Sequence, residues 1–323
     1  MNILVTGLGF VGINVVLHLL NKNFNVTVLV RKSGNPIRKH FMNVASSKGA
    51  DIVTLEKFDK ESILKILEMK DIDAVVNCVG ALRGDYDMLF VSNVKIPLDI
   101  ADAVLEQKSD ISMIHIGTAY MSCTMGKVIY EEENYLDEKL FKPKTAYEKT
   151  KYLCEKYLYE RVEKGLRLVV LRPVMMLGKY CYHEESNSFI EILRKLNYIP
   201  ITDKGFNILD IENFCIVIEH ILNSVHNIHF DYLYVPGTYY TLTNIMEAFS
   251  QVLEIKCRYT RVPFLDKLLP LFAPRTVKPY LKYLGVKFTS RKLEKYVTVP
   301  KDDIFKIARD HITSLKQLNL IKL

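Results

Sequence analysis

Residues 2–12, NILVTGLGFVG, decide the fold class of this chain. The run up to Thr6 is apolar and β-branched, which is typical of a strand, and the apolar spacing of residues 10–20 predicts a helix. The turn between them is rich in glycine, so a pyrophosphate could approach the backbone and meet unpaired N–H groups at the helix N-terminus. An ordinary glycine-rich turn is the alternative. We expect cofactor contacts at Gly7, Gly9, Phe10, Val11 and Gly12.

Strands and helices keep alternating after this first unit. Apolar runs predict strands, and helical spacing lies between them; the strands are 25–30, 51–55, 74–79, 112–116 and 168–171, and the helices are 60–69, 94–106 and 145–164. Such alternation implies a parallel sheet, and near-continuous apolar strands imply helices on both faces. We therefore predict an α/β fold with a doubly wound parallel sheet (Rossmann fold).

The pattern weakens after Pro173, where we predict helices at 186–196 and 211–222 and a strand at 232–235. Residues 1–172 are expected to form the dinucleotide-binding Rossmann domain, with 205–237 contributing to it. Residues 173–204 and 238–323 are expected to form a smaller, mainly helical substrate-binding lobe.

The composition excludes several classes of protein. Of 323 residues, 49% are hydrophobic and 25% are charged, values that exclude disordered, collagenous and low-complexity chains. The six cysteines form no CxxC pair, so neither a disulfide framework nor a structural zinc site is indicated. No stretch reaches the roughly 20 uncharged apolar residues that span a bilayer. We expect a cytoplasmic enzyme without a metal.

The end of the second strand bears on the choice of cofactor. Arg31, Lys32 and Ser33 stand where a carboxylate would accept the ribose 2′-hydroxyl of NAD(H). Two cations and a hydroxyl suit a 2′-phosphate instead, although a solvated basic loop is the alternative. The sequence thus favours NADP(H) over NAD(H).

A second group of residues carries acid/base chemistry. Tyr147 and Lys151 lie four apart in a predicted helix, so they share a face, and a nearby cation can lower a tyrosine pKa by roughly one to three pH units. This spacing alone is common on surface helices. Thr118, however, follows a predicted strand at the sheet edge where doubly wound folds bind ligands.

With these motifs in this order, the chain resembles the extended short-chain dehydrogenase/reductase family, also called the NAD-dependent epimerase/dehydratase family. The resemblance covers most of residues 1 to about 240. It implies that Tyr147 is the acid/base, that Lys151 is its electrostatic partner and a ribose ligand, and that Thr118 anchors the substrate oxygen. It further implies cofactor contacts at Asn77, Val79, Gly80, Asn93 and Pro173.

Two reactions remain open within the family. Residues 205–213 lack the Arg of the segment that holds a sugar diphosphate, and Asn213 replaces its Asp, which weakens an epimerase or dehydratase activity. Residues 114–121 and 146–155 are similar to reductase domains that release acyl thioesters. We therefore expect an NADP(H)-dependent oxidoreductase acting on a carbonyl or alcohol. Nucleotide-sugar epimerisation or dehydration, and a structural role without turnover, remain alternatives.

The basic residues gather near the C-terminus. Between positions 256 and 295, eleven Lys or Arg residues stand against two acidic ones. An anionic substrate or peripheral membrane contact through 261–295 would explain this excess, and solvated cations are the alternative. The expected partners are a small-molecule substrate and a second copy in a homodimer, but no nucleic acid.

Residues 181–183 are Cys-Tyr-His, which could supply two metal ligands. Because no third or fourth ligand is apparent, we predict a solvent-facing loop there.

Overall fold

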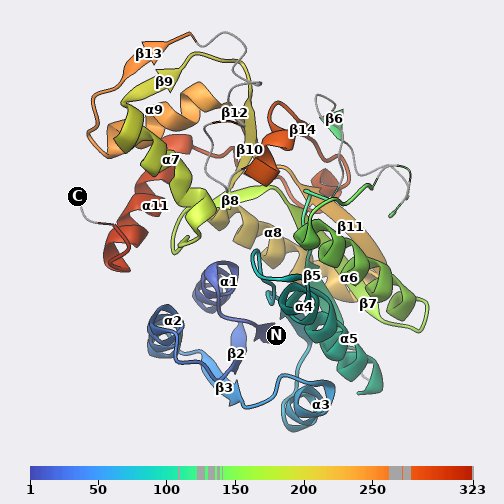
Figure 1. Ribbon diagram of the computed structural model, residues 1–323. Coiled ribbons are helices and arrows are strands. Elements are labelled where there is room, and N and C mark those ends of the chain that lie inside the picture. The colour runs from blue at the N-terminus through green and yellow to red at the C-terminus, as the bar shows by residue number, and fades with distance from the viewer. Residues whose placement is uncertain are drawn as a thin grey trace.

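A seven-stranded parallel sheet forms the centre of the molecule (Figure 1). The computed structural model describes residues 1–107, 110–121, 128–129, 135–136, 139, 141–261, 271 and 278–321. The strand order is β11-β7-β5-β4-β1-β2-β3, and every neighbouring pair is parallel. The strands are β1 (Asn2–Thr6), β2 (Asn25–Arg31), β3 (Asp51–Leu55), β4 (Ala74–Asn77), β5 (Ser112–Ile116), β7 (Arg167–Pro173) and β11 (Phe230–Val235). The predicted doubly wound fold is confirmed.

Helices cover both faces of this sheet, which explains the unbroken apolar runs. On β1, Ile3 and Val5 belong to one core cluster and Leu4 to another, because successive side chains point to opposite faces. One layer contains α1 (Phe10–Asn21), α2 (Pro36–Ser47) and α8 (Ile211–Ser224); the other contains α3 (Lys60–Met69), α5 (Ile96–Glu106) and α6 (Ala146–Val162).

Two local differences from the sequence prediction have clear causes. Helix α2 was not predicted, although Asn35 accepts a hydrogen bond from the Arg38 N–H and Pro36 opens the first turn, both standard start signals. Strand β4 ends at Asn77 rather than Val79, because the Asn77 side chain turns the backbone there. Before α5 come α4 (Tyr86–Phe90) and the π-helical turn η1 (Val91–Lys95).

Most of the remaining elements lie at the carboxyl end of the sheet, whereas η2 (Val225–Asn227) precedes β11 at the amino end, where the Ser112 hydroxyl donates to the Val225 carbonyl. They form three small sheets, β12-β10-β8, β13-β9 and β14-β6. Figure 1 shows α7, α9 and α11 together on the far side of β8 from α3 and α5. The elements are β6 (Val128–Ile129), β8 (Met175–Leu177), α7 (Glu184–Leu196), β9 (Tyr198–Pro200), β10 (Gly205–Asp210), η2 (Val225–Asn227), β12 (Thr238–Thr241), α9 (Leu242–Val252), β13 (Arg258–Thr260), η3 (Lys278–Tyr283), β14 (Lys287–Phe288), η4 (Leu293–Lys295) and α11 (Ile304–Gln317).

Residues 205–237 contribute both to the large sheet and to one of the small sheets. Strand β10 joins a small sheet, α8 packs on α1, and β11 extends the large sheet with Leu233 opposite Leu171. Within the described part of the chain, no helix combines the length and the apolar character needed to cross a membrane.

Candidate active site

A cavity of about 530 Å³ opens at the carboxyl ends of the central strands. Its walls come from the glycine-rich turn after β1, the turn after β4, the residues after β5, helix α6 and the segment after β7. Strands β1 and β4 are neighbours in the sheet, although β2 and β3 follow β1 in the chain. The cavity therefore lies at the point where the strand order reverses, which is where doubly wound folds bind ligands.

The glycine-rich turn has the shape that a pyrophosphate requires. Gly7 has φ +84°, and a Cβ on Gly12 would lie 2.0 Å from the Gly7 carbonyl oxygen, so neither position accepts a side chain. Helix α1 begins at Phe10 with no side-chain cap and no acidic residue in its first turn. Gly9, Phe10 and Val11 line the cavity. These features fit a dinucleotide phosphate at the helix N-terminus.

The basic residues after β2 lie on the same edge of the sheet but outside the cavity wall. The Gly7 N–H donates to the Leu29 carbonyl, which places the end of β2 beside the turn. Arg31 is exposed, and Lys32 pairs with Glu56 at 2.6 Å in an ion pair that is itself largely exposed. The Ser33 hydroxyl accepts from the Asn35 N–H.

Two of the predicted cofactor ligands support loops instead of lining the cavity. The side-chain amide oxygen of Asn77 accepts from the Thr6 hydroxyl and from the Val79 N–H. Asn93 pairs with both backbone groups of Ala81. Val79 and Gly80 themselves line the cavity. Direct contact of the two asparagines with a cofactor stays a prediction, because their amides already hold the turn after β4.

Pro173, at the end of β7, also lines the cavity. The preceding Arg172 faces the other way: its side chain is 1% exposed and pairs with the buried Glu155 of α6 at 2.6 Å. This ion pair fixes α6 against the sheet, and so helps to place the side chains of α6 that reach the cavity.

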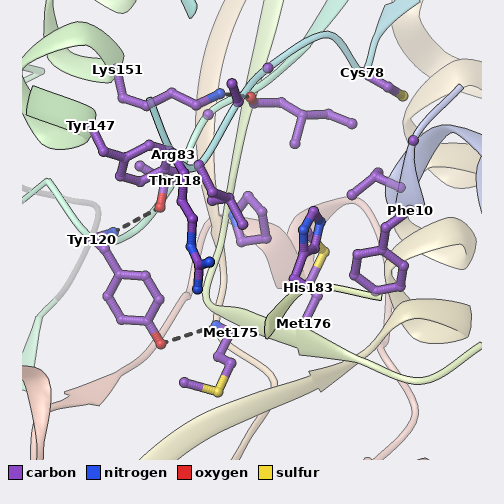
Figure 2. A pocket seen from close by; sticks show the side chains of 18 of the residues that line it. Phe10, Cys78, Arg83, Thr118, Tyr120, Tyr147, Lys151, Met175, Met176 and His183 are labelled. Carbon is purple, nitrogen blue, oxygen red and sulfur yellow. Dashed lines mark hydrogen bonds between the residues drawn. The ribbon is translucent and has the colours of Figure 1, made fainter. Parts of the chain in front are cut away.

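Thr118, Tyr147 and Lys151 line the same cavity (Figure 2). Helix α6 starts with a capping box, in which Thr145 accepts from the Glu148 N–H and Glu148 accepts from the Thr145 N–H. The box fixes the first turn of α6, where Tyr147 lies. Thr118 reaches the cavity from the residues after β5.

Hydrogen bonds hold the side chains of Lys151 and Thr118 in place. The buried Lys151 ammonium donates to the Ile116 carbonyl at 2.9 Å, and burial lowers its pKa below the usual lysine value. The Thr118 hydroxyl oxygen accepts from the Tyr120 N–H at 3.2 Å, which leaves its hydrogen to donate elsewhere. A Cβ on Gly80 would lie 3.5 Å from the Lys151 Nζ, so the turn after β4 passes directly beside the ammonium.

Beyond Tyr147, the cavity wall is mostly apolar and aromatic. Burial raises the pKa of Tyr120, which therefore stays protonated, and its hydroxyl oxygen accepts from the Met175 N–H at 3.0 Å. Arg83, His183 and Glu184 also line this part of the cavity and were not among the predicted site residues. The walls of this part are formed by Leu82, Arg83, Tyr120, Met175, Met176, His183, Glu184 and Tyr280.

The sequence family described as the NAD dependent epimerase/dehydratase family matches residues 3–199, more than half of the chain. The chain belongs to this family. The predicted resemblance is thereby confirmed, and with it the expectation of a nicotinamide-dependent enzyme. A comparison with curated protein sequences finds no match.

Solved structures of extended epimerases and dehydratases share the fold. UDP-glucose-4-epimerase from Stenotrophomonas maltophila, with bound NAD and formylated UDP-arabinopyranose, has a TM-score of 0.76 at 13% identity, with 99% of both chains covered. UDP-glucuronic acid 4-epimerase from Bacillus cereus, in complex with NAD, has a TM-score of 0.74 at 16% identity, with 98% of this chain and 97% of that one covered. dTDP-glucose 4,6-dehydratase from Bacillus anthracis, in complex with NAD, has a TM-score of 0.71 at 16% identity, with 98% and 97% covered.

One prediction about this family member is wrong. Residues 181–183 do not form a solvent-facing loop, because Cys181 is fully buried and His183 packs edge-on against Phe10 with ring centroids 5.9 Å apart. Tyr182 packs against Phe41 of α2 and would lie 3.6 Å from a Cβ on Gly9. The aromatic side chains, unremarkable in the sequence, bury this segment over the glycine-rich turn. Among the described residues, no cluster of three or more His, Cys, Asp or Glu could hold a metal.

Part of the basic C-terminal segment lies within the described residues, but 262–270 and 272–277 lie outside them. Lys282 pairs with Glu148, Lys287 lies over the Tyr239 ring at 4.9 Å, and Lys292 pairs with Asp231. These three cations contact the protein itself. A membrane contact through 261–295 stays a prediction.

Proposed function

We propose that this protein is an NADP(H)-dependent oxidoreductase that transfers hydride to or from a carbonyl or alcohol substrate. The observation that carries the proposal is the meeting of Thr118, Tyr147 and Lys151 in one cavity, next to a turn shaped for a dinucleotide. A bound nicotinamide would supply or accept the hydride.

Side chains of the protein carry out the proton transfers at the substrate oxygen. Tyr147 gives a proton to the substrate oxygen in reduction and takes it back in oxidation. Thr118 donates its hydroxyl hydrogen to the same oxygen, because its own oxygen already accepts from the Tyr120 N–H. One of the three Lys151 N–H groups donates to Ile116, and the ammonium provides positive charge that favours the ionised form of Tyr147.

The preference for NADP(H) rests on the end of β2. No carboxylate stands at residues 31–35 to accept a ribose 2′-hydroxyl, and Arg31 is exposed at that edge. Lys32 can also reach a phosphate, because its ion pair with Glu56 is exposed and therefore weak. The three solved structures described above hold NAD, at identities too low to transfer a cofactor preference.

Epimerisation or dehydration of a nucleotide sugar is the second candidate, favoured by the family membership. The segment from β10 to α8 argues against it, because residues 205–213 contain no Lys or Arg and because Asn213 and Asp210 are engaged within the protein. The Asn213 amide donates to the Pro300 carbonyl and to Asp302, and Asp210 caps α8 and pairs with Lys306.

The deciding experiment follows NADPH absorbance with aldehydes, ketones, acyl thioesters and nucleotide sugars, and identifies the products by NMR. Consumption of NADPH with a carbonyl compound supports the proposal. Conversion of a nucleotide sugar without net consumption of cofactor replaces it with the epimerase or dehydratase activity. Tight cofactor binding without turnover of any compound favours a structural role.

A further inference from the structure

Arg83 brings a positive charge to the substrate part of the cavity. It follows β4 by six residues, in the same turn whose Val79 and Gly80 line the cofactor side. Figure 2 shows its side chain pointing into the cavity that Thr118 and Tyr147 also line. The guanidinium group pairs with the carboxylate of Glu184, the first residue of α7, across the cavity mouth.

Arg83 contributes its charge to a part of the cavity wall that is otherwise largely apolar and aromatic. Nearby wall residues are Leu82, Tyr120, Met175 and Met176, whose side chains suit an apolar substrate body. Lys151, the other Lys or Arg in the described lining, lies one helical turn after Tyr147 on α6 and donates to the Ile116 carbonyl. An anionic group placed away from the reacting carbon would therefore meet Arg83.

The existing ion pair shows that a carboxylate fits against the Arg83 guanidinium. Glu184 already presents a carboxylate to the guanidinium, and the planar guanidinium fork matches the two oxygens of a carboxylate. The Glu184 side chain is 72% exposed, so this partner is well solvated and the pair contributes little to stability. A substrate carboxylate inside the cavity can therefore replace it.

We propose that the substrate is an oxo or hydroxy acid with an apolar body, and that Arg83 binds its carboxylate in exchange for Glu184. This inference rests on the proposed oxidoreductase function and names its substrate class. It assigns Arg83 as a specificity-determining residue.

The test compares keto acids with their methyl esters, which differ in charge and little in shape. Benzoylformate, benzoylpropionate and benzoylbutyrate place the carboxylate at increasing distance from the ketone, and NADPH consumption is measured for each acid and ester. We expect the wild-type protein to favour at least one acid over its ester by about tenfold or more in kcat/KM, as a charged hydrogen bond implies. Equal or higher kcat/KM for all three esters would overturn the proposal.

Variants distinguish binding of the substrate carboxylate by Arg83 from a purely structural role of the ion pair between Arg83 and Glu184. Arg83→Leu should raise KM for the acid by about tenfold and leave the ester within about twofold, while Arg83→Lys should retain part of the preference. Glu184→Gln should lower KM for the acid, because it removes the competing carboxylate. If Arg83→Leu and Glu184→Gln change KM for the acid and for the ester alike, the ion pair has only a structural role and the inference fails. Arg309→Leu, at an exposed position on α11, controls for the loss of one surface charge.

A binding measurement separates this inference from the proposed function. Phenylbutyrate and its methyl ester carry no ketone, so their affinity for the NADPH complex, measured by calorimetry, does not depend on turnover. Acid-selective binding that Arg83→Leu abolishes supports the carboxylate site even if no ketone is reduced. Reduction of neutral ketones together with charge-independent binding supports the proposed function and rejects the role of Arg83.

Discussion

The buried carboxylate of Glu148 pairs with the ammonium of Lys282, and so joins the residue after Tyr147 to the C-terminal part of the chain. The Tyr283 hydroxyl lies 3.1 Å from the same carboxylate and 2.5 Å from the Tyr120 carbonyl oxygen. Residues far apart in sequence thus brace the cavity wall around the first turn of α6.

Breaking this pair should destabilise the protein. Lys282→Met leaves the Glu148 carboxylate buried without its cation, and we expect a loss of about 1–3 kcal/mol in the free energy of unfolding, less than for a fully buried pair because Lys282 is partly exposed. Urea denaturation measures the change. Lys278→Met, at an exposed position in the same segment, should have almost no effect; equal losses in the two variants would contradict the role of the pair.

Tyr147→Phe should lower kcat by about 100-fold or more while leaving cofactor affinity nearly unchanged, because it removes only the proton carrier. Lys151→Met should reduce both kcat and cofactor affinity, since the ammonium contributes to the cofactor site and to the positive charge near Tyr147. Steady-state kinetics and NADPH titration provide the two readouts. Tyr157→Phe, on the same helix, is the control, and a Tyr147→Phe protein that keeps a tenth of the wild-type rate would assign proton transfer to another group.

Arg31→Asp should shift cofactor preference from NADPH toward NADH. The substitution removes a phosphate partner and adds a carboxylate for the 2′-hydroxyl, each change amounting to about 1–3 kcal/mol. Fluorescence titration of both cofactors measures it, with Arg258→Asp, at an exposed position on β13, as the control. Tighter binding of NADH by the unmodified protein would refute the NADP(H) preference.

Gly12→Ala should abolish cofactor binding, because its Cβ would lie 2.0 Å from the Gly7 carbonyl oxygen and the turn must open to admit it. Gly34→Ala controls for folding, because its added Cβ meets no atom within 4 Å outside the adjacent residues. Circular dichroism verifies folding and NADPH titration measures affinity. Retention of normal affinity by the Gly12 variant would show that the turn adapts.

Stability should fall in mild acid because of His311. Burial lowers its pKa to about 3, whereas an unfolded histidine titrates near 6.5, so only the unfolded chain takes up this proton between those values. The contribution is fully present above pH 6.5 and is lost as the pH falls toward about 3. His311→Met should reduce the slope of unfolding free energy against pH in that window by up to about 1.4 kcal/mol per pH unit. Parallel curves for wild type and variant would contradict this, and the exposed His220 provides the control His220→Gln.

The central sheet and the cofactor turn were predictable because their signals are local. Alternating apolar strands and helices determine a doubly wound sheet. Glycine is required at position 7 by its positive φ and at position 12 by the Gly7 carbonyl oxygen in the same turn. Thr118, Tyr147 and Lys151 could be singled out because strand ends and helix spacing place side chains by simple geometry.

Other parts of the site depend on contacts between residues distant in sequence. Arg83 and Glu184 are about 100 positions apart, and each looks like an ordinary surface charge until the fold brings both to the cavity mouth. Residues 181–183 carry no apolar pattern, yet they pack against Phe10 and Phe41 from other elements. The sheet, the dinucleotide turn and the spacing of the acid/base pair follow from backbone periodicity, so the order of the amino acids is enough to predict them. The charges that face the substrate are selected by long-range packing, so they become visible only in the folded chain.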